Sequence, residues 1–300
     1  MTDHVQLPEG IYTALVTPFA DGEVDRAAWR TLVERQVDAG VAGLVPIGCT
    51  GEAAALSTRE REWLVRTTVE IADGRCCVLA GSGTNVTAST IEFTRLVAAW
   101  GADAAMLISP YYNKPQQHGL VAHYAAVAAA VDIPLVLYNV PGRTAVNILP
   151  ETVRVLAATP GIVAVKEASG DLEQIREMIE TSGLQVFSGD DGLNLEILRL
   201  GAQGAISVLS NLLPATLVRL WTAWRSGDEA TAIEHQLMLD PVIAACFRET
   251  NPVPVKQMLA DLGLCRHDLR LPLVPALPET QSWLKSFGAE TLSKLLEAEG

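Results

Sequence analysis

The sequence predicts a (β/α)8 barrel, and three observations lead to this prediction. Eight short apolar segments recur along the chain, and each is followed by a segment with helical periodicity. Most of the eight are apolar at nearly every position, which is typical of parallel strands covered on both faces. The eight units fill about 225 residues without a large insertion, close to the usual barrel length of roughly 250. A doubly wound open sheet produces the same local signals and remains the alternative.

The predicted strands share a composition rich in Val, Ile, Leu and Ala. They are Ile11–Phe19, Gly43–Gly48, Cys76–Gly83, Ala104–Pro110, Pro134–Val140, Ile162–Ser169, Leu184–Asp191 and Gly204–Asn211. Polar residues stand at the carboxyl ends of most of these segments. Barrel enzymes place their catalytic groups at that end of the barrel, so we expect the catalytic residues among these polar side chains.

Residues typical of helix ends flank the predicted helices between the strands. Asp25 precedes an amphipathic run, and Ser57 with Glu60 has the spacing of a capping box. Pro150 occupies a first helical position, and Asp171 is a further N-cap. Four glycines follow helical runs, where a left-handed C-cap is needed: Gly40, Gly101, Gly183 and Gly201.

The chain changes character after the eighth unit. We assign residues 1–225 to a catalytic barrel and residues 226–300 to a C-terminal helical region, because no strand pattern occurs in the second range. Three helical stretches are expected there: Gly227–Phe247, Pro252–Leu262 and Glu279–Ala298. This region is a candidate for contacts between subunits.

Composition and charge exclude several function classes. Hydrophobic residues make up 49 % of the 300 residues, enough for a large core. The 35 acidic and 22 basic residues give a formal net charge of −13, so nucleic acid is not an expected partner. No apolar run reaches the roughly 18 residues of a membrane span, and the first ten residues do not resemble a signal peptide. We expect a soluble, cytoplasmic protein that does not bind a membrane.

The cysteines and histidines indicate neither disulfides nor a metal site. The five cysteines have no disulfide or zinc spacing, and the five histidines never form a metal-binding pair such as HExxH. The chain also lacks a phosphate-binding P-loop, a complete dinucleotide fingerprint and a GxSxG nucleophile elbow. We therefore expect chemistry without a metal, with the reactive group supplied by the chain itself.

Lys166 is the sharpest candidate for that group. It interrupts the apolar segment Ile162–Val165, and an apolar barrel disfavours the charged form of a lysine, which lowers the pKa of its amine. A neutral amine attacks a ketone to form a Schiff base, an electron sink for making or breaking carbon–carbon bonds. The alternative is a buried ion pair with Glu167 or Asp190, and Lys166 alone does not decide between the two.

Other strand ends favour the Schiff base, although each has a simpler explanation. Tyr138 ends the fifth strand, where its hydroxyl could shuttle protons or merely pack. The Gly48–Gly51 segment offers amides and a hydroxyl to a carboxylate, or is only a tight turn. Arg143, in a short loop, could bind a second carboxylate or be a solvated surface residue. At a net charge of −13, an anionic substrate needs such local positive charge.

Six motifs in combination resemble those of the pyruvate-dependent class I aldolases, the N-acetylneuraminate lyase family. The resemblance covers almost the whole chain, from Leu15 to Lys256, and is greatest to the synthase branch. The motifs are Gly48–Glu52, Pro110–Pro115, Tyr138–Thr144, Val165–Gly170, Ser188–Asp191 and Gly204–Val208.

This resemblance implies a reaction and a role for each residue. Lys166 would form a Schiff base with pyruvate, without a further cofactor, and the enamine would attack L-aspartate 4-semialdehyde to give 4-hydroxytetrahydrodipicolinate, a precursor of lysine and diaminopimelate. Tyr138 would donate and accept protons near the imine. Thr50, with the amides of Cys49 and Thr50, would bind the pyruvate carboxylate, and Arg143 the carboxylate of the semialdehyde.

The resemblance also implies a homo-oligomer, usually a tetramer arranged as a dimer of dimers. Tyr112 would relay protons in the site of a neighbouring subunit, so that the oligomer is part of the mechanism. Gly189 and Ile206 would line the pyruvate pocket.

Two departures from the family pattern lead to separate expectations. Cys49 occupies a position that is normally a threonine linking two tyrosines, and a thiol is the weaker hydrogen-bond donor, so we expect pyruvate binding to persist and the proton relay to slow. Ser89 and Arg61 stand where regulated members carry a glutamate and a histidine. We therefore expect weak or no inhibition by lysine.

Two alternatives remain for the function. The first is a pyruvate-releasing aldolase acting on a 2-keto-3-deoxy sugar acid, which would share Lys166 and Tyr138. The second is a catalytically impaired paralogue that binds pyruvate, and Cys49 is its only support.

Overall fold

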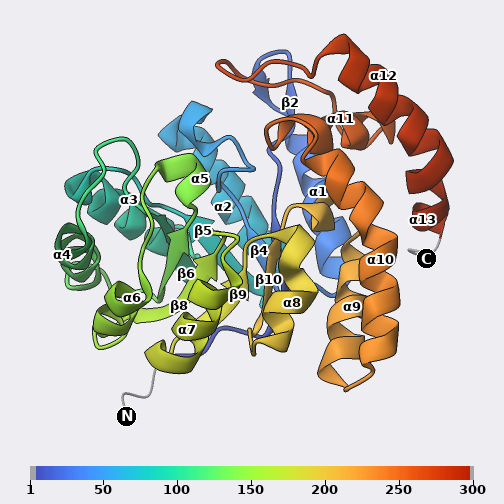
Figure 1. The fold of residues 1–300 in the computed structure, drawn as a ribbon. Coiled ribbons are helices and arrows are strands. Elements are labelled where there is room, and N and C mark those ends of the chain that lie inside the picture. Colours follow the sequence, from blue (N-terminus) through green and yellow to red (C-terminus); the bar gives the residue numbers. More distant parts are fainter. Residues whose placement is uncertain (1–4, 298–300) are drawn as a thin grey trace. The chain divides into compact units, whose positions relative to one another are not determined.

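The computed structural model describes residues 5–297, and its eight parallel strands close into a barrel in the order β1-β10-β9-β8-β7-β6-β5-β4 (Figure 1). The predicted barrel is confirmed, and the open-sheet alternative is wrong. The strands are β1 (Gly10–Ala14), β4 (Gly43–Val45), β5 (Cys77–Gly81), β6 (Ala104–Ile108), β7 (Leu135–Asn139), β8 (Ile162–Glu167), β9 (Gln185–Ser188) and β10 (Gly204–Ser207).

All eight strands are shorter than the predicted segments, because the prediction included residues that follow each strand. The segment Ile11–Phe19, for example, contains most of β1 and then runs into a hairpin that the sequence did not reveal. This hairpin pairs β2 (Phe19–Ala20) with β3 (Glu23–Val24). Its turn contains Asp21 and Gly22, both with positive φ, which is typical of short hairpin turns.

The described chain consists of two compact units. Unit 1 comprises residues 5–9 and Cys77–Ile206, and unit 2 comprises Gly10–Cys76 and residues 207–297. The division predicted from the sequence, a barrel over 1–225 and a helical region over 226–300, remains a prediction about domain organisation.

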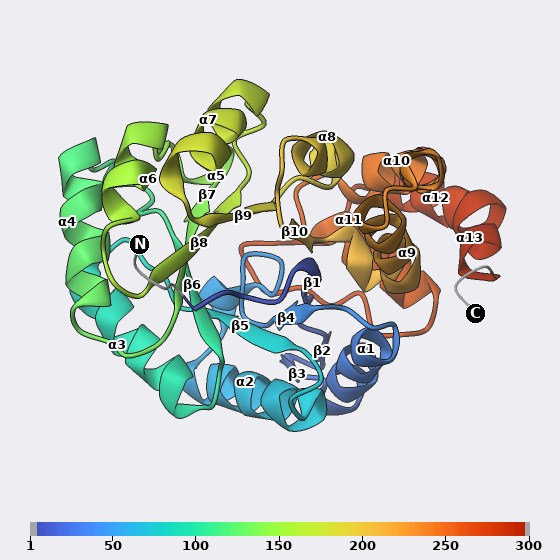
Figure 2. The same ribbon diagram turned by 90° about the horizontal axis from the view of Figure 1, so that it is seen from below.

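In unit 1 the helices lie outside the strands. Figure 2 shows α3, α4, α6 and α7 around strands β5 to β8. The strand side chains between them are almost entirely buried, as expected for parallel strands covered on both faces. The helices of unit 1 are α3 (Thr87–Ala99), α4 (Gln117–Ala128), α5 (Pro141–Thr144), α6 (Pro150–Leu156), α7 (Leu172–Ser182) and α8 (Asn194–Arg199), with a 3-10 turn, η2 (Asp191–Leu193).

Unit 2 contains strands β1 and β4, the hairpin, and helices from both ends of the sequence. Helices α9 and α10 pack side by side, as Figure 1 shows. The helices are α1 (Arg26–Asp38), α2 (Thr58–Ala72), α9 (Pro214–Arg225), α10 (Glu229–Cys246), α11 (Val253–Asp261), α12 (Pro278–Phe287) and α13 (Ser293–Glu297), with the turns η1 (Ala53–Ala55) and η3 (Leu209–Asn211) and a π-helical segment, η4 (Gly288–Leu292).

The predicted helix ends are confirmed by their hydrogen bonds. Asp25 accepts from the amide of Ala28 at the start of α1, and Ser57 and Glu60 form both halves of the capping box of α2. The predicted C-cap glycines all have positive φ: Gly40, Gly101, Gly183 and Gly201.

The C-terminal helices begin and end close to the predicted positions, with one difference. The stretch predicted as a single helix over Glu279–Ala298 is divided into α12, η4 and α13, and its last residue lies outside the described residues. Within residues 5–297, no helix combines the length and the apolar character needed to cross a membrane.

Candidate active site

Lys166 and Tyr138 lie side by side on neighbouring strands of unit 1. Tyr138 of β7 pairs with Lys166 of β8 in the strand register, and the ammonium nitrogen lies 4.3 Å from the centroid of the tyrosine ring. Both residues are buried, with 5 % and 6 % of their surface exposed. An amine held in this way can act as a nucleophile, and the phenol beside it can donate and accept protons.

The space beside Lys166 depends on Gly189. A Cβ atom at this position would lie 3.0 Å from Lys166 Cε and 2.9 Å from Ala168 Cβ. Any side chain here would therefore press on the lysine stem. Ile206, also expected to line the pyruvate pocket, is buried in β10, one residue after the pair formed by Ala205 with Ser188.

The acidic neighbours of Lys166 have partners elsewhere. Successive side chains of a strand point to opposite faces, which turns Glu167 away from Lys166. Glu167 accepts hydrogen bonds from the Ser169 amide at 2.7 Å and from Asn139 Nδ2 at 2.9 Å, and burial raises the pKa of its carboxyl. Asp190 accepts from the Gly192 amide at 3.1 Å. These contacts do not favour the ion-pair interpretation of Lys166.

Asn139 connects β7 to the segment that carries Arg143. Its Nδ2 also donates to Asn147 Oδ1 at 2.8 Å, and its Oδ1 accepts from the Ile148 amide at 2.9 Å. Arg143 itself is exposed and lies in α5, a single helical turn, where the sequence predicted a loop. Pro141 starts this turn, because its fixed φ suits a first helical position.

In contrast to Lys166 and Tyr138, Tyr112 is exposed to solvent. It follows β6 with a φ of 72° and is 89 % exposed. The next residue, Asn113, donates from its side chain to the Asn85 carbonyl at 2.9 Å, which attaches this loop to the segment before α3. Because the Tyr112 side chain is exposed, a second molecule can reach it.

In unit 2, Thr50 and Cys49 lie in a tight turn after β4. The amides of Gly51 and Glu52 donate to the carbonyls of Gly48 and Cys49, each at 3.1 Å. Thr50 is buried, with 4 % of its surface exposed, and its hydroxyl accepts from Asn251 Nδ2 at 3.0 Å. Cys49 is a partly exposed free thiol. The segment therefore forms a tight turn, and its binding of a carboxylate remains a prediction.

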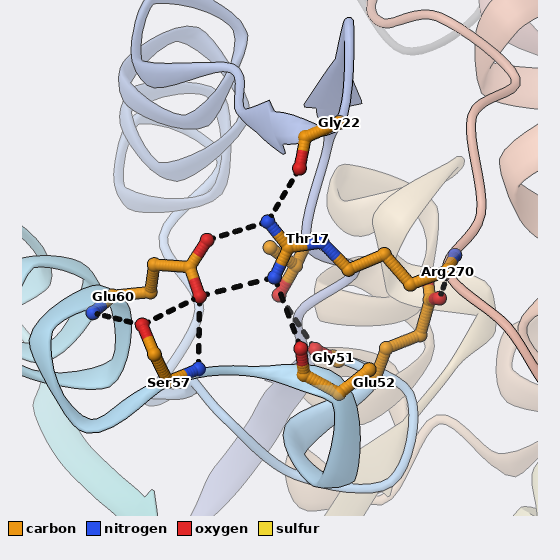
Figure 3. Close-up of polar contacts among 8 residues, drawn as sticks. Thr17, Gly22, Gly51, Glu52, Ser57, Glu60 and Arg270 are labelled. Atoms are coloured by element: carbon orange, nitrogen blue, oxygen red, sulfur yellow. Dashed lines mark hydrogen bonds and ion pairs between the residues drawn. The ribbon is translucent and has the colours of Figure 1, made fainter.

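Glu52, which ends this turn, belongs to a charge cluster with Lys256 and Arg270, and Figure 3 shows its contact with Arg270. It has a left-handed backbone with φ of 53°, and its carboxylate binds Lys256 Nζ at 2.6 Å and the Arg270 amide at 3.1 Å. Burial lowers the pKa of Lys256, and Glu52 opposes that effect. The Lys256 and Arg270 cations lie 4.4 and 4.3 Å from the centroid of the Phe19 ring.

Arg270 extends the cluster to helix α2. Its guanidinium forms two hydrogen bonds with Glu60, at 2.5 and 3.0 Å, and one with the Gly22 carbonyl at 2.7 Å (Figure 3). Sequence reasoning missed Arg270 and Asn251 and gave Lys256 no role. Their partners lie roughly 200 residues away in the chain, beyond the range of any local pattern.

The predicted site residues are thus divided between the two units. In unit 1, Lys166, Tyr138 and Gly189 lie together, and Arg143 and Tyr112 are exposed on the segments after β7 and β6. In unit 2, Cys49 and Thr50 share one turn. Within the described residues, no three His, Cys, Asp or Glu side chains are grouped as metal ligands.

A closed barrel with a buried lysine near the carboxyl end of a strand fits a class I, Schiff-base lyase. Residues 7–288 match the model of the Dihydrodipicolinate synthetase family, and this chain belongs to that family.

Named relatives agree with this assignment. The chain is 48 % identical over 280 residues to a 4-hydroxy-tetrahydrodipicolinate synthase of Nitratidesulfovibrio vulgaris (strain Miyazaki F), covering 92 % of this chain and 96 % of the relative. It is 46 % identical to the enzyme of the same name from Thermodesulfovibrio yellowstonii, covering 88 % and 92 %. The solved 4-hydroxy-tetrahydrodipicolinate synthase of Methylacidiphilum fumariolicum superimposes with a TM-score of 0.93 at 39 % identity, covering 97 % and 98 %.

Proposed function

We propose that this protein condenses pyruvate with L-aspartate 4-semialdehyde to give 4-hydroxytetrahydrodipicolinate, through a Schiff base on Lys166. The observation that carries the proposal is the buried Lys166 amine beside the Tyr138 ring. The relatives with 46–48 % identity over most of the chain are named for this reaction, which favours it over cleavage of a sugar acid.

The chemistry follows from the Lys166 amine. Its nitrogen adds to the ketone carbon of pyruvate, and loss of water gives a protonated imine. The imine accepts the electron pair when the pyruvate methyl group loses a proton, and the resulting enamine attacks the aldehyde carbon of the semialdehyde. The aldehyde oxygen takes up a proton, and the amine of the second substrate closes the ring as it displaces Lys166. Tyr138 is the proposed proton donor and acceptor for these steps.

The remaining roles are proposed from the family resemblance. Thr50 and the Cys49 and Thr50 amides would bind the pyruvate carboxylate, and Arg143 would bind the carboxylate of the semialdehyde through paired hydrogen bonds. Ile206 and Gly189 would line the pocket. A cytoplasmic homotetramer, in which Tyr112 serves a neighbouring subunit, completes the proposal.

Reductive trapping tests whether Lys166 forms a Schiff base with pyruvate. Borohydride added with pyruvate should reduce the imine and leave one N-(1-carboxyethyl) group, which peptide mapping should place on Lys166. Lys166→Ala should remain unmodified, whereas Lys285→Ala, at an exposed position of α12, should be trapped like the wild type. An intact wild-type protein that forms no adduct would refute the Schiff-base mechanism.

The second substrate needs its own assay. Wild-type enzyme should consume pyruvate only in the presence of aspartate semialdehyde, and it should not release pyruvate from 2-keto-3-deoxy sugar acids. The opposite pattern would make the protein an aldolase of the same family.

Cys49 allows a test of the impaired-paralogue alternative. Cys49→Thr should raise kcat about tenfold and leave KM for pyruvate nearly unchanged, because a hydroxyl is a stronger relay donor and the backbone amide is retained. Cys49→Ala should not raise kcat. Steady-state kinetics of the three proteins measure this, and an inactive wild type restored by threonine would favour the impaired paralogue.

A further inference from the structure

The hydroxyl of Thr50 is oriented by one side chain. Asn251 Nδ2 donates to Thr50 Oγ1 at 3.0 Å, and the two residues are 7 % and 4 % exposed. Among residues 5–297, Asn251 is the hydrogen-bond partner of this hydroxyl. A hydroxyl has one hydrogen and two lone pairs, so an oxygen that accepts from an amide keeps its own hydrogen for another acceptor.

We propose that Asn251 is a positioning residue for the carboxylate of the keto-acid substrate. By donating to Thr50, it fixes the hydroxyl as a donor toward that carboxylate. The proposal rests on the proposed function, because it takes Thr50 as a carboxylate ligand. Asn251 would act only through Thr50 and would not touch the substrate.

The segment that carries Asn251 contacts the turn at two positions. Asn251 lies just before α11, and Lys256 of α11 binds Glu52 at 2.6 Å, two residues beyond Thr50. The turn is further held by Thr17, whose hydroxyl donates to the Gly51 carbonyl at 2.7 Å. Backbone and charge contacts therefore fix the turn itself, which leaves the direction of the Thr50 hydroxyl as the particular contribution of Asn251.

Two substitutions separate this role from a merely structural one. Asn251→Ala removes the donor and lets the hydroxyl rotate. Asn251→Asp places an acceptor at the same position, so the Thr50 hydroxyl donates to the new carboxylate and turns away from the substrate. We expect KM for pyruvate to rise about fivefold in the alanine variant and further in the aspartate variant, with a smaller change in kcat.

Thr50→Val supplies the decisive background, because it retains the shape of the side chain and removes the hydroxyl. In the Thr50→Val background, Asn251→Ala should change KM for pyruvate by less than about twofold. The reason is that Asn251 acts on KM only by orienting the Thr50 hydroxyl, which this background lacks. Gln257→Ala is the matched control: it removes an amide from α11 that binds Asp261 at 2.9 Å, and KM should be unchanged.

The outcomes are distinguishable. Asn251→Ala with an unchanged KM, or an equal rise in KM in the Thr50→Val background, would overturn the positioning role. Asn251→Asp is left out if it fails to fold, as judged by circular dichroism and thermal unfolding. In that case the double-mutant cycle of Asn251→Ala and Thr50→Val still tests the positioning role. Absence of a borohydride adduct in the wild type would overturn both the proposed function and the positioning role of Asn251. Normal trapping of the wild type, together with an unchanged KM for pyruvate in Asn251→Ala, would overturn the positioning role alone.

Discussion

The proposed mechanism requires a residue without a side chain at position 189, beside the Lys166 stem. A Cβ here would lie 3.0 Å from Lys166 Cε and 3.1 Å from the Glu167 carbonyl oxygen, so alanine would displace the lysine stem. Gly189→Ala should lower the rate of borohydride trapping with pyruvate at least tenfold and leave the protein folded.

Gly288→Ala is the control for this prediction, because a Cβ at Gly288 meets nothing within 4 Å. It should be trapped at the wild-type rate. Equal trapping of Gly189→Ala and wild type would show that the space beside Lys166 is not used by the substrate.

At the scale of elements, an ion pair links helix α2 to the segment after α11. Arg270 and, to a lesser extent, the Ser57 cap lower the pKa of Glu60 to about 2. A carboxyl whose pKa is lower in the folded state stabilises the fold above its unfolded pKa of about 4.5, and this contribution is lost as the pH falls through the range from about 4.5 to about 2.

Glu60→Gln should therefore lower the free energy of unfolding by about 1–2 kcal/mol at pH 7, a value reduced by solvent screening of this partly solvated pair. The difference from wild type should vanish near pH 2. Urea denaturation across this pH range measures it, with Glu62→Gln as a control from an exposed pair on the same helix. A difference independent of pH would contradict the assignment to charge.

The buried pair of Lys256 with Glu52 joins α11 to the turn after β4. Lys256→Met leaves the Glu52 carboxylate buried with one backbone donor, the Arg270 amide, and should cost about 3–5 kcal/mol of unfolding free energy. Glu52→Gln combined with Lys256→Met should recover part of this loss, because no charge then remains buried. Chemical denaturation of the three proteins checks the prediction, and a double variant less stable than Lys256→Met would contradict it.

At the scale of the whole molecule, the exposed Tyr112 leads to a prediction about assembly. If Tyr112 serves the site of a neighbouring subunit, then Lys166→Ala and Tyr112→Phe subunits should complement each other. A mixed oligomer contains sites with an intact lysine from one chain and an intact tyrosine from the other. Co-expression with two tags, tandem purification and a condensation assay should show activity well above that of either parent.

Two controls accompany the complementation. Lys166→Ala mixed with a Lys166→Ala, Tyr112→Phe double variant should stay inactive. A protein that sediments as a monomer, or mixed oligomers no more active than the Tyr112→Phe parent, would exclude a role for Tyr112 in a neighbouring subunit.

Much of the fold was predictable, because its signals are local. The eight strands are mostly apolar segments of three to six residues, and caps such as Asp25 and Ser57 act on amides within three positions of themselves. The short hairpin of β2 and β3 was missed, because two-residue strands carry no periodic pattern. The helical turn at Arg143 was missed for a similar reason, since four residues are too few for helical periodicity.

The sequence by itself determined the barrel, the helix ends and the candidate lysine, since each depends on the character of a short segment. The tertiary structure decided the partners. It placed the Lys166 amine against the Tyr138 ring, turned Glu167 toward Asn139, and brought Asn251 to Thr50 across about 200 residues of chain. These contacts arise only when separate segments pack together, and the direction of a hydroxyl or the pairing of a buried charge depends on such contacts.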